Sequence, residues 1–257
     1  MGSTIARSFI TSHYQGQIFV YNRTLEKARA LQAAFPDRIV LCPDNLCVAR
    51  SSEIIFLAVK ADDAGDILRT LTPYMHADQI LLYTISAMPI AEVESIVPCK
   101  AVKLIPSITH FSKAGALPIV FGTRITDADR VNISDRLCAI GIPHPIAEKS
   151  IRIYADLTSC SPAFLADWLQ QFTLAAQEKG VDRKTAEFLL GQMVYGVGKL
   201  LIEENLSLED IIRRVAVPGG VTTAGLDAIH QSAQGMLQKA LDATEARQNH
   251  IAQYGHA

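Results

Sequence analysis

The sequence has no long hydrophobic run and no excess of charge of either sign. Its longest apolar stretches, such as 54–59 and 80–83, have the length of strands and are far too short to cross a bilayer. Lys and Arg total 24 against 26 for Asp and Glu, so a formal charge of -2 gives no basic field for nucleic acid or an anionic membrane. The N-terminus carries no export signal. We therefore expect a cytoplasmic protein that binds neither nucleic acid nor membrane.

The sequence also lacks the cysteine and histidine spacings of metal and redox sites. Five cysteines are scattered, and none belongs to a Cys-x-x-Cys pair. Seven histidines are equally dispersed, without a ligand motif. We predict buried, reduced thiols and no metal.

The chain has two parts that differ in their pattern of apolar residues. Up to about residue 150, short apolar strands alternate with helical patterns, which is typical of a parallel sheet covered by helices. Strands are expected at 17–21, 39–41, 53–58, 80–84, 101–105 and 119–121, and helices at 24–35, 64–71, 90–96 and 128–139. Beyond Tyr154 only helices are expected, at 162–179, 183–203, 207–215 and 223–252. We predict a Rossmann-like, doubly wound parallel sheet that binds NAD(P) in residues 1–150, and an all-helical domain for dimerisation and substrate in residues 151–257.

The start of the dinucleotide fold is incomplete. Such a sheet opens with a strand and a Gly-x-Gly-x-x-Gly turn before its first helix. Here Met1-Gly2-Ser3-Thr4-Ile5-Ala6 is similar only to the end of that turn; alternatively, residues 1–13 are an ordinary amphipathic helix. Because the first strand lies centrally, its loss leaves neighbouring strands with unpaired backbone groups, at about 1–3 kcal/mol each where they are buried. We therefore expect a sheet without its first strand, in a chain shortened from a longer one; mass spectrometry that finds Met1 at the start of the folded, cofactor-binding native protein would contradict this.

Two strand ends carry candidate cofactor residues. Asn22-Arg23-Thr24 follows an early strand, and an arginine there, without an Asp or Glu for the ribose hydroxyls, suits a 2'-phosphate. NADPH is therefore favoured, with NADH as the alternative; a solvated charge and a helix cap are the plainer interpretation. Lys60 ends a buried strand at the carboxyl edge, where such sheets bind ligands, unless it is a solubilising charge. The segment 84–86 borders the same crevice.

The segment 216–223 separates two predicted helices. Its adjacent glycines allow close backbone approach, and the hydroxyls of Thr222 and Thr223 stand at the N-terminus of the next helix. This arrangement favours an anion, although a helix stop and a threonine cap would give the same pattern.

These motifs together resemble the pyrroline-5-carboxylate reductase family. The segment 217–222 is similar to its Ser-Pro-Gly-Gly-x-Thr, the segment 57–61 to its Leu-Ala-Val-Lys-Pro, and the segment 154–164 to a shortened form of its helix opener. Val217 and Ala61 depart from that pattern, as does the segment 103–109, which stands where the reductases carry Arg-x-Met-Pro-Asn-Thr-Pro. These variants look more like the late-competence, ComER-type branch of the family.

The resemblance implies NAD(P)H-dependent reduction of the ring C=N bond of 1-pyrroline-5-carboxylate to proline. It implies Thr222 and Lys60 as the catalytic residues, the first at the ring nitrogen and the second beside the nicotinamide. It implies that the substrate carboxylate lies on the amides of Gly219, Gly220, Val221 and Thr222. We expect the cofactor to bind at Gly2, Ser3, Asn22, Arg23, Thr24, Asn45, Ala58, Val59, Lys60, Ala61, Thr84, Ile85 and Ser86.

Two other functions stay open. The chain could be an accessory or regulatory protein that keeps the reductase fold without the activity, or a reductase of another small substrate. The helical domain has more apolar surface than a small bundle hides, for example in 188–201. The resemblance implies a homodimer, alone or assembled further.

Overall fold

The computed structural model describes residues 2–12 and 14–254, so Met1 and His13 lie outside the described residues. The chain divides into two compact units, which are described separately. The first comprises residues 1–162 and 245–257, and the second residues 163–244. No helix in the described part is long and apolar enough to cross a membrane.

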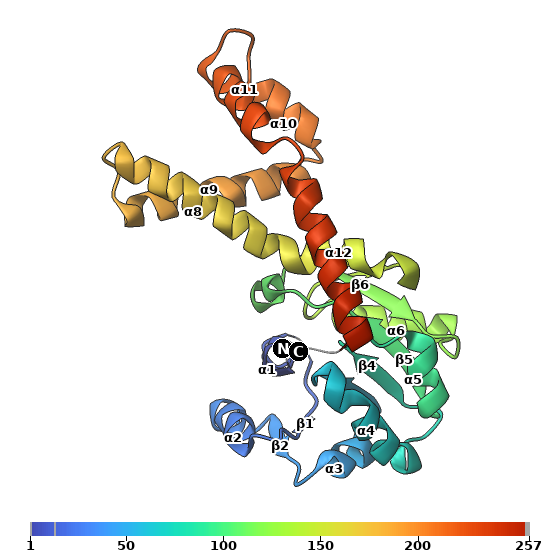
Figure 1. Ribbon diagram of the computed structural model, residues 1–257. Coiled ribbons are helices and arrows are strands. Elements are labelled where there is room, and N and C mark those ends of the chain that lie inside the picture. Colours follow the sequence, from blue (N-terminus) through green and yellow to red (C-terminus); the bar gives the residue numbers. More distant parts are fainter. Residues whose placement is uncertain (1, 13, 255–257) are drawn as a thin grey trace. The chain divides into compact units, whose positions relative to one another are not determined.

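Five strands form the larger sheet of the first unit, in the order β3-β4-β5-β6-β7 (Figure 1). They are β3 (Ile54–Leu57), β4 (Ile80–Tyr83), β5 (Lys100–Leu104), β6 (Ala116–Phe121) and β7 (Ile142–Pro145). All neighbours pair in parallel except β5 and β6, which are antiparallel. A second, two-stranded parallel sheet contains β1 (Ile18–Val20) and β2 (Ile39–Leu41).

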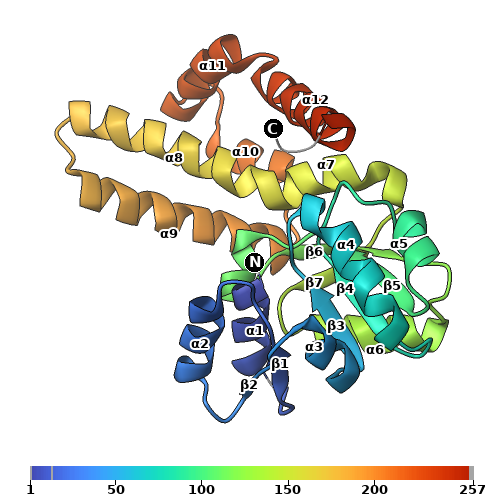
Figure 2. The ribbon, with the colours of Figure 1, turned by 60° about the horizontal axis from the view of Figure 1, so that its bottom comes forward.

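Helices cover both faces of the larger sheet (Figures 1 and 2). The helices of this unit are α1 (Gly2–Ile10), α2 (Leu25–Ala34), α3 (Asn45–Ser51), α4 (Ala61–Leu71), α5 (Ile90–Ile96), α6 (Asp127–Leu137) and α7 (Ile151–Ala155). Short 3-10 segments lie at Thr72–Tyr74, Ile108–Ser112 and Glu148–Ser150, and a π-helical turn at Asp156–Cys160.

The inner strands of this sheet are largely apolar because both of their faces are buried. In β4, Leu81 and Tyr83 point to a core that includes Leu68 of α4, whereas Ile80 and Leu82 point to a core that includes Ile133 of α6. The alternation follows from the two-residue period of a strand. The sequence-based prediction of a sheet between two helical layers is confirmed.

The two sheets are not joined by hydrogen bonds. A groove of about 1020 Å³ separates β1 from β3 and is lined by residues 17–21 of one edge and by residues 53, 54, 56 and 57 of the other. Within the described residues, β1 pairs only with β2, and β3 pairs only with β4. The β-structure of this unit is thus interrupted between β1 and β3.

The second unit consists of helices. They are α8 (Ser161–Glu178), which begins just before the unit, α9 (Arg183–Ile202), α10 (Leu208–Val215), α11 (Val221–Ala233) and the first part of α12 (Met236–Tyr254). Asp182 caps α9 by accepting a hydrogen bond from the Thr185 amide, and Ser207 forms a capping box with Asp210 at α10. The predicted gaps between 162–179, 183–203, 207–215 and the helix that follows are confirmed, and they contain Gly180, Asn205 and residues 218–220.

The structure corrects the predicted elements at four places. The helices α3 and α7 were not predicted. The strand β7 was not predicted either, because it contains Pro143 and Pro145. It lies at the sheet edge, where prolines are tolerated, and the amides of Ile142 and Ile146 still donate hydrogen bonds to the carbonyls of Gly115 and Ile119. The predicted helix 223–252 is two helices, because Gly235 has a φ of 73°, which ends α11 and starts α12.

The five cysteines are free. Cys42 and Cys99 are buried, as expected, and burial raises the pKa of the Cys99 thiol to about 11. Cys138 is exposed, however, so the prediction of buried thiols is wrong at that position.

Candidate functional site

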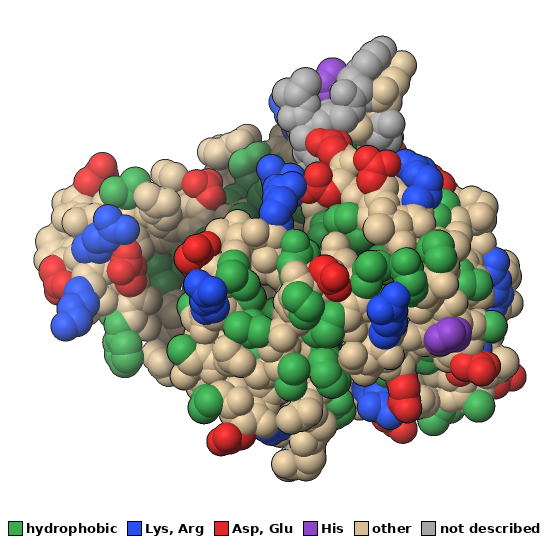
Figure 3. Space-filling view, turned by 90° about the horizontal axis from the view of Figure 1, so that it is seen from below, with side chains coloured by type: hydrophobic (Ala, Val, Ile, Leu, Met, Phe, Trp, Pro, Cys, Tyr) green, Lys and Arg blue, Asp and Glu red, His purple; other side chains and the backbone are tan. Residues whose placement is uncertain are grey.

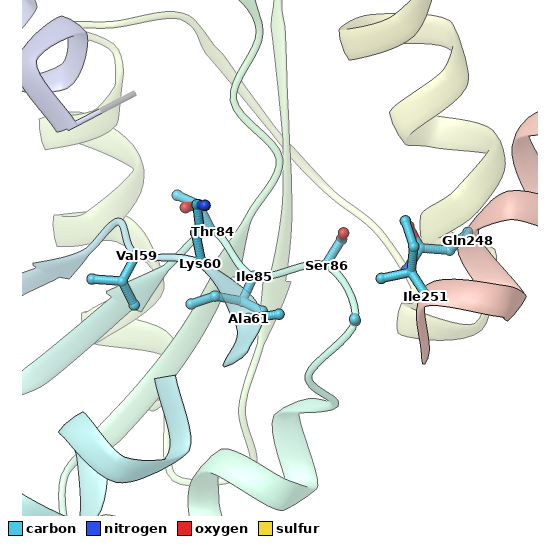
Figure 4. Close-up of a pocket in the computed structure, with 9 residues that line it drawn as sticks. Val59, Lys60, Ala61, Thr84, Ile85, Ser86, Gln248 and Ile251 are labelled. Atoms are coloured by element: carbon cyan, nitrogen blue, oxygen red, sulfur yellow. The ribbon is translucent and has the colours of Figure 1, made fainter. Parts of the chain in front are cut away.

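The carboxyl ends of β3 and β4 lie side by side, because the two strands are parallel. The residues after them surround a cavity of about 170 Å³. Its lining consists of Val59, Lys60, Ala61, Thr84, Ile85, Ser86, Ala87, Gln248 and Ile251. In Figure 4, Gln248 and Ile251 of α12 face the strand ends across this space. Predicted residues from two separate segments are thus brought together, and α12 adds two residues that sequence reasoning missed.

Lys60 stands at the point where β3 turns into α4. It is the N-cap residue of α4, and its carbonyl accepts a hydrogen bond of 3.2 Å from the Asp63 amide. Its side chain is exposed, and the residue lines both the small cavity and the large groove. The positive charge of Lys60 thus lies at the carboxyl edge of the parallel strands, as the sequence predicts.

The loop from β4 to α5 is held from behind by a buried ion pair. Lys103 of β5 is 1% exposed, and its Nζ donates to Oε1 of Glu148 at 2.8 Å and to the Ser86 carbonyl at 3.1 Å. The same carboxylate oxygen accepts the Ile90 amide at 2.9 Å, at the start of α5. The Tyr83 hydroxyl donates to the Met88 carbonyl at 3.1 Å. Three side chains thus fix the backbone of a cavity-lining loop, and only one of them, Lys103, belongs to a segment singled out by the sequence motifs.

Burial dominates the electrostatics of this pair. It lowers the pKa of Lys103 below 10.5, although Glu148 acts in the opposite direction. Burial, together with Glu148, also raises the pKa of Tyr83. Lys103 lies 5.7 Å from the Tyr83 ring, so its charge is compensated by a carboxylate, a carbonyl and an aromatic face.

The other predicted cofactor residues line the groove between β1 and β3. They are Gly2, Ser3, Asn22, Arg23, Thr24, Asn45, Ala58, Val59 and Lys60. The first turn of α1 opens to the groove, and the Asn22 side-chain amide donates to the Thr24 carbonyl at 3.0 Å. Thr24 occupies the predicted N-cap position of α2, but its side chain makes no capping hydrogen bond.

Arg23 has a partner that sequence reasoning missed. Its Nη1 lies 3.3 Å from Oδ2 of Asp63, which belongs to the first turn of α4 and lines the same groove. An acid therefore lies beside the predicted 2'-phosphate residue, although β1 itself ends without one.

The segment after β5 uses its polar groups internally. The Ser107 side chain accepts a hydrogen bond from the Thr109 amide, and the Ser159 hydroxyl donates to the Pro106 carbonyl at 3.1 Å. His110 is 2% exposed; its Nδ1 accepts the Ser107 amide at 3.0 Å, so Nε2 carries the proton and lies 3.3 Å from the Ala116 carbonyl. These hydrogen bonds hold the segment in a fixed turn.

His110 makes the stability of this turn depend on pH. Burial lowers the pKa of His110 below its usual 6.5. The folded protein therefore resists protonation, and we expect His110 to stabilise it fully above pH 6.5 and progressively less as the pH falls through the folded pKa. Urea unfolding between pH ~7 and ~5 checks this against His110→Asn, whose amide oxygen can accept the same hydrogen bond. An identical pH dependence in both proteins would contradict the assignment.

The predicted substrate loop lies in the second unit. Gly219 has a φ of 74°, and the Gly220 amide donates to the Val217 carbonyl at 2.9 Å. Gly220 is the N-cap of α11, so Val221 and Thr222 lie in its first turn, where backbone amides are free of intrahelical partners. Val221 is 92% exposed and Thr222 is half-buried. The Thr223 hydroxyl instead donates to the Val217 carbonyl at 2.7 Å. Thr222, not Thr223, is therefore the hydroxyl available to a ligand.

Charges of both signs are mixed on the surface. Figure 3 shows Lys and Arg side chains dispersed among Asp and Glu over one face. The described residues contain no group of His, Cys, Asp and Glu that could hold a metal ion. The charged groups of the site are thus separate cations and carboxylates, such as Lys60 and the Arg23–Asp63 pair, and they stand beside hydroxyls, amides and backbone groups.

A doubly wound sheet with a cavity at its carboxyl edge, followed by a helical unit, defines the class of nicotinamide-dependent oxidoreductases with a helical dimerisation domain. Comparisons agree, because residues 1–87 match the family described as NADP oxidoreductase coenzyme F420-dependent, and residues 148–251 match pyrroline-5-carboxylate reductase dimerisation. The chain belongs to the pyrroline-5-carboxylate reductase family.

Individual relatives support this placement. ComE operon protein 4 of Bacillus subtilis (strain 168) is 31% identical over 250 residues, covering 96% of this chain and 91% of that protein. Pyrroline-5-carboxylate reductase 3 of the same organism is 25% identical over 248 residues, covering 95% and 90%. The crystal structure of Plasmodium falciparum pyrroline carboxylate reductase with NADP bound has a TM-score of 0.85 at 21% identity, covering 98% and 94%. The resemblance to the family and to its late-competence branch is confirmed.

Proposed function

We propose that the protein reduces 1-pyrroline-5-carboxylate to proline with NADPH as the cofactor. The observation that carries the proposal is that Lys60 and its neighbours meet Thr84–Ser86 in one cavity at the carboxyl edge of the parallel strands. This edge is where doubly wound sheets bind dinucleotides. The NADP-bound Plasmodium falciparum structure, which shares the fold, supports the choice of cofactor.

The groups around the groove fit an anionic dinucleotide. Arg23 and Lys60 supply positive charge, Asn22 an amide, and the first turn of α1 backbone donors. Asn22, Arg23 and Asn45 would hold the adenosine ribose and its phosphate, and Lys60 the nicotinamide side. The bound cofactor supplies the hydride.

The second unit offers the groups for the substrate. Amides of Gly219, Gly220, Val221 and Thr222 would hold the carboxylate, because the first turn of α11 presents donors without intrahelical partners. The Thr222 hydroxyl would donate a hydrogen bond to the ring nitrogen. A cyclic imine whose nitrogen accepts this hydrogen bond is electrophilic at its ring carbon, and the nitrogen takes its proton from water as the hydride adds to the carbon. Orientation and carboxylate binding therefore suffice, and no nucleophile is required.

The proposal is tested by mixing the purified protein with NADPH and 1-pyrroline-5-carboxylate. We expect NADPH absorbance to fall and proline to form in equal amounts. Omitting the imine gives the background rate. A protein that binds NADPH, seen by isothermal titration calorimetry, but forms no proline would support the second candidate.

That second candidate is an accessory or regulatory protein that keeps the fold without the activity. It is favoured by Val217, an exposed apolar residue that stands where the reductases carry serine, and by the likeness to ComE operon protein 4. Replacing Val217 by serine separates the two functions. If Val217→Ser forms proline and the wild type does not, the chain keeps the reductase site and lacks the activity because of this one residue.

We also propose that the second unit forms a homodimer, which could assemble further. Its helices expose large apolar side chains to a degree that is unusual for a monomer: Phe172, Phe188, Leu189, Met193, Tyr195, Ile202 and Leu208. We expect light scattering at micromolar concentration to give twice the mass of the 28.0 kDa chain, or a multiple of it. A monomer mass would contradict the proposal.

A further inference from the structure

Arg23 and Asp63 form an ion pair across the mouth of the nucleotide groove. The two side chains come from the turn after β1 and the first turn of α4, and both line the groove. They lie 3.3 Å apart and are 79% and 40% exposed, so a ligand in the groove can reach both of them. The Asp63 amide is tied to the Lys60 carbonyl, which fixes the base of the side chain.

The pair combines the two side chains that separate the nicotinamide cofactors. A guanidinium suits the 2'-phosphate of NADPH, and a carboxylate accepts hydrogen bonds from the ribose hydroxyls of NADH. Folds that prefer NADH usually carry the acid at the end of the second strand, whereas here α4 brings the acid to the arginine.

We propose that Asp63 is a specificity-determining residue, which weakens NADPH binding by competing for Arg23 and strengthens NADH binding by accepting a ribose hydroxyl. The inference rests on the proposed function, because it requires the adenosine end of the cofactor beside Arg23. A 2'-phosphate near Asp63 is repelled by the carboxylate and must also replace it at the guanidinium. The ribose of NADH has no such charge and leaves the ion pair intact.

Asp63→Asn removes the charge and keeps the shape of the side chain. We expect NADPH to bind roughly fivefold more tightly, because about 1 kcal/mol of repulsion is lost at this exposed site. We expect NADH to bind more weakly, since an amide oxygen is a poorer acceptor than a carboxylate. The measurement is the dissociation constant of each nucleotide by calorimetry, at low and at high salt. The gain for NADPH should shrink at high salt, because exposed charges are screened.

Asp66→Asn is the matched control. Asp66 lies one turn further along α4, lines the same groove, and pairs with Arg69 instead of Arg23. It should leave the ratio of the two dissociation constants unchanged. If Asp63→Asn has the same ratio of NADPH to NADH dissociation constants as the wild type, the proposal for Asp63 is overturned, although the protein still binds nucleotide. If the wild type binds neither nucleotide, the proposed function and the role of Asp63 both fail.

Discussion

Glu148→Ala is expected to lower the free energy of unfolding by about 3–5 kcal/mol, because it removes one partner of a buried ion pair and leaves the other charged. Lys103 is 1% exposed, whereas the Glu148 side chain is 30% exposed, so the lysine is the partner that water cannot reach. The substitution also leaves the Ile90 amide at the start of α5 without its acceptor. Urea unfolding followed by circular dichroism gives the value.

Lys103→Met is the informative comparison. It removes the buried charge itself and leaves a carboxylate that is partly solvated, so we expect a smaller loss than for Glu148→Ala. The double variant should be more stable than the sum of the two single losses predicts, since neither charge is left unpaired. Equal losses for the two single variants, with simple additivity, would show that the ion pair contributes no more than packing.

The pH dependence of the Glu148→Ala variant follows from the lysine. The folded pKa of Lys103 is lowered by burial, so the folded state favours neutral lysine and gains stability as the pH rises from that pKa toward 10.5. Without Glu148 the amine loses the group that favours its charged form. We therefore expect the stability gap between wild type and Glu148→Ala to narrow as the pH is raised.

Thr222→Ala is expected to lower kcat for pyrroline-5-carboxylate reduction roughly a hundredfold. The ring nitrogen gains electron density as the C=N bond is reduced, and the Thr222 hydroxyl is the donor proposed to stabilise it. KM should change little, because the carboxylate is held by backbone amides of the first turn of α11. Steady-state kinetics with varied imine at saturating NADPH separates the two parameters.

Two neighbouring substitutions serve as controls. Thr222→Ser keeps the hydroxyl and should retain most of the activity. Thr223→Ala removes the hydrogen bond to the Val217 carbonyl and tests whether loop structure alone explains a loss. If Thr222→Ala keeps the wild-type kcat, the protein is still a reductase, but the proposed role of this hydroxyl is wrong.

Most of the sheet could be predicted because its strands are short apolar runs between turn residues. β4 is an example, since its residues Ile80 to Tyr83 are all buried. β7 could not be predicted, because prolines at alternate positions are tolerated only at an edge, and sequence does not say which strand is the edge. The break at Gly235 was missed because a single glycine within a helical pattern is usually tolerated.

The candidate site was predictable where its residues follow a strand end. Lys60 and Thr84–Ser86 meet because parallel strands end at one edge, which the pattern alone indicates. Asp63 and Glu148 reach their partners over 40 and 45 residues of sequence, so no local spacing points to them. Lys103 stands out in the sequence only as part of the divergent segment 103–109, and it is the fold that identifies Glu148 as its partner.

The groove between β1 and β3 links local stability to nucleotide affinity. The β1–β2 sheet, which carries Asn22 and Arg23 at its edge, meets the rest of its unit through helix packing and side chains rather than through a shared ladder of backbone hydrogen bonds. Such a part can loosen before the larger sheet does. The measured affinity for the adenosine half is then the intrinsic affinity multiplied by the fraction of molecules in which this part is closed. Any contact that holds the part in place acts, at a distance, as a nucleotide-binding contact.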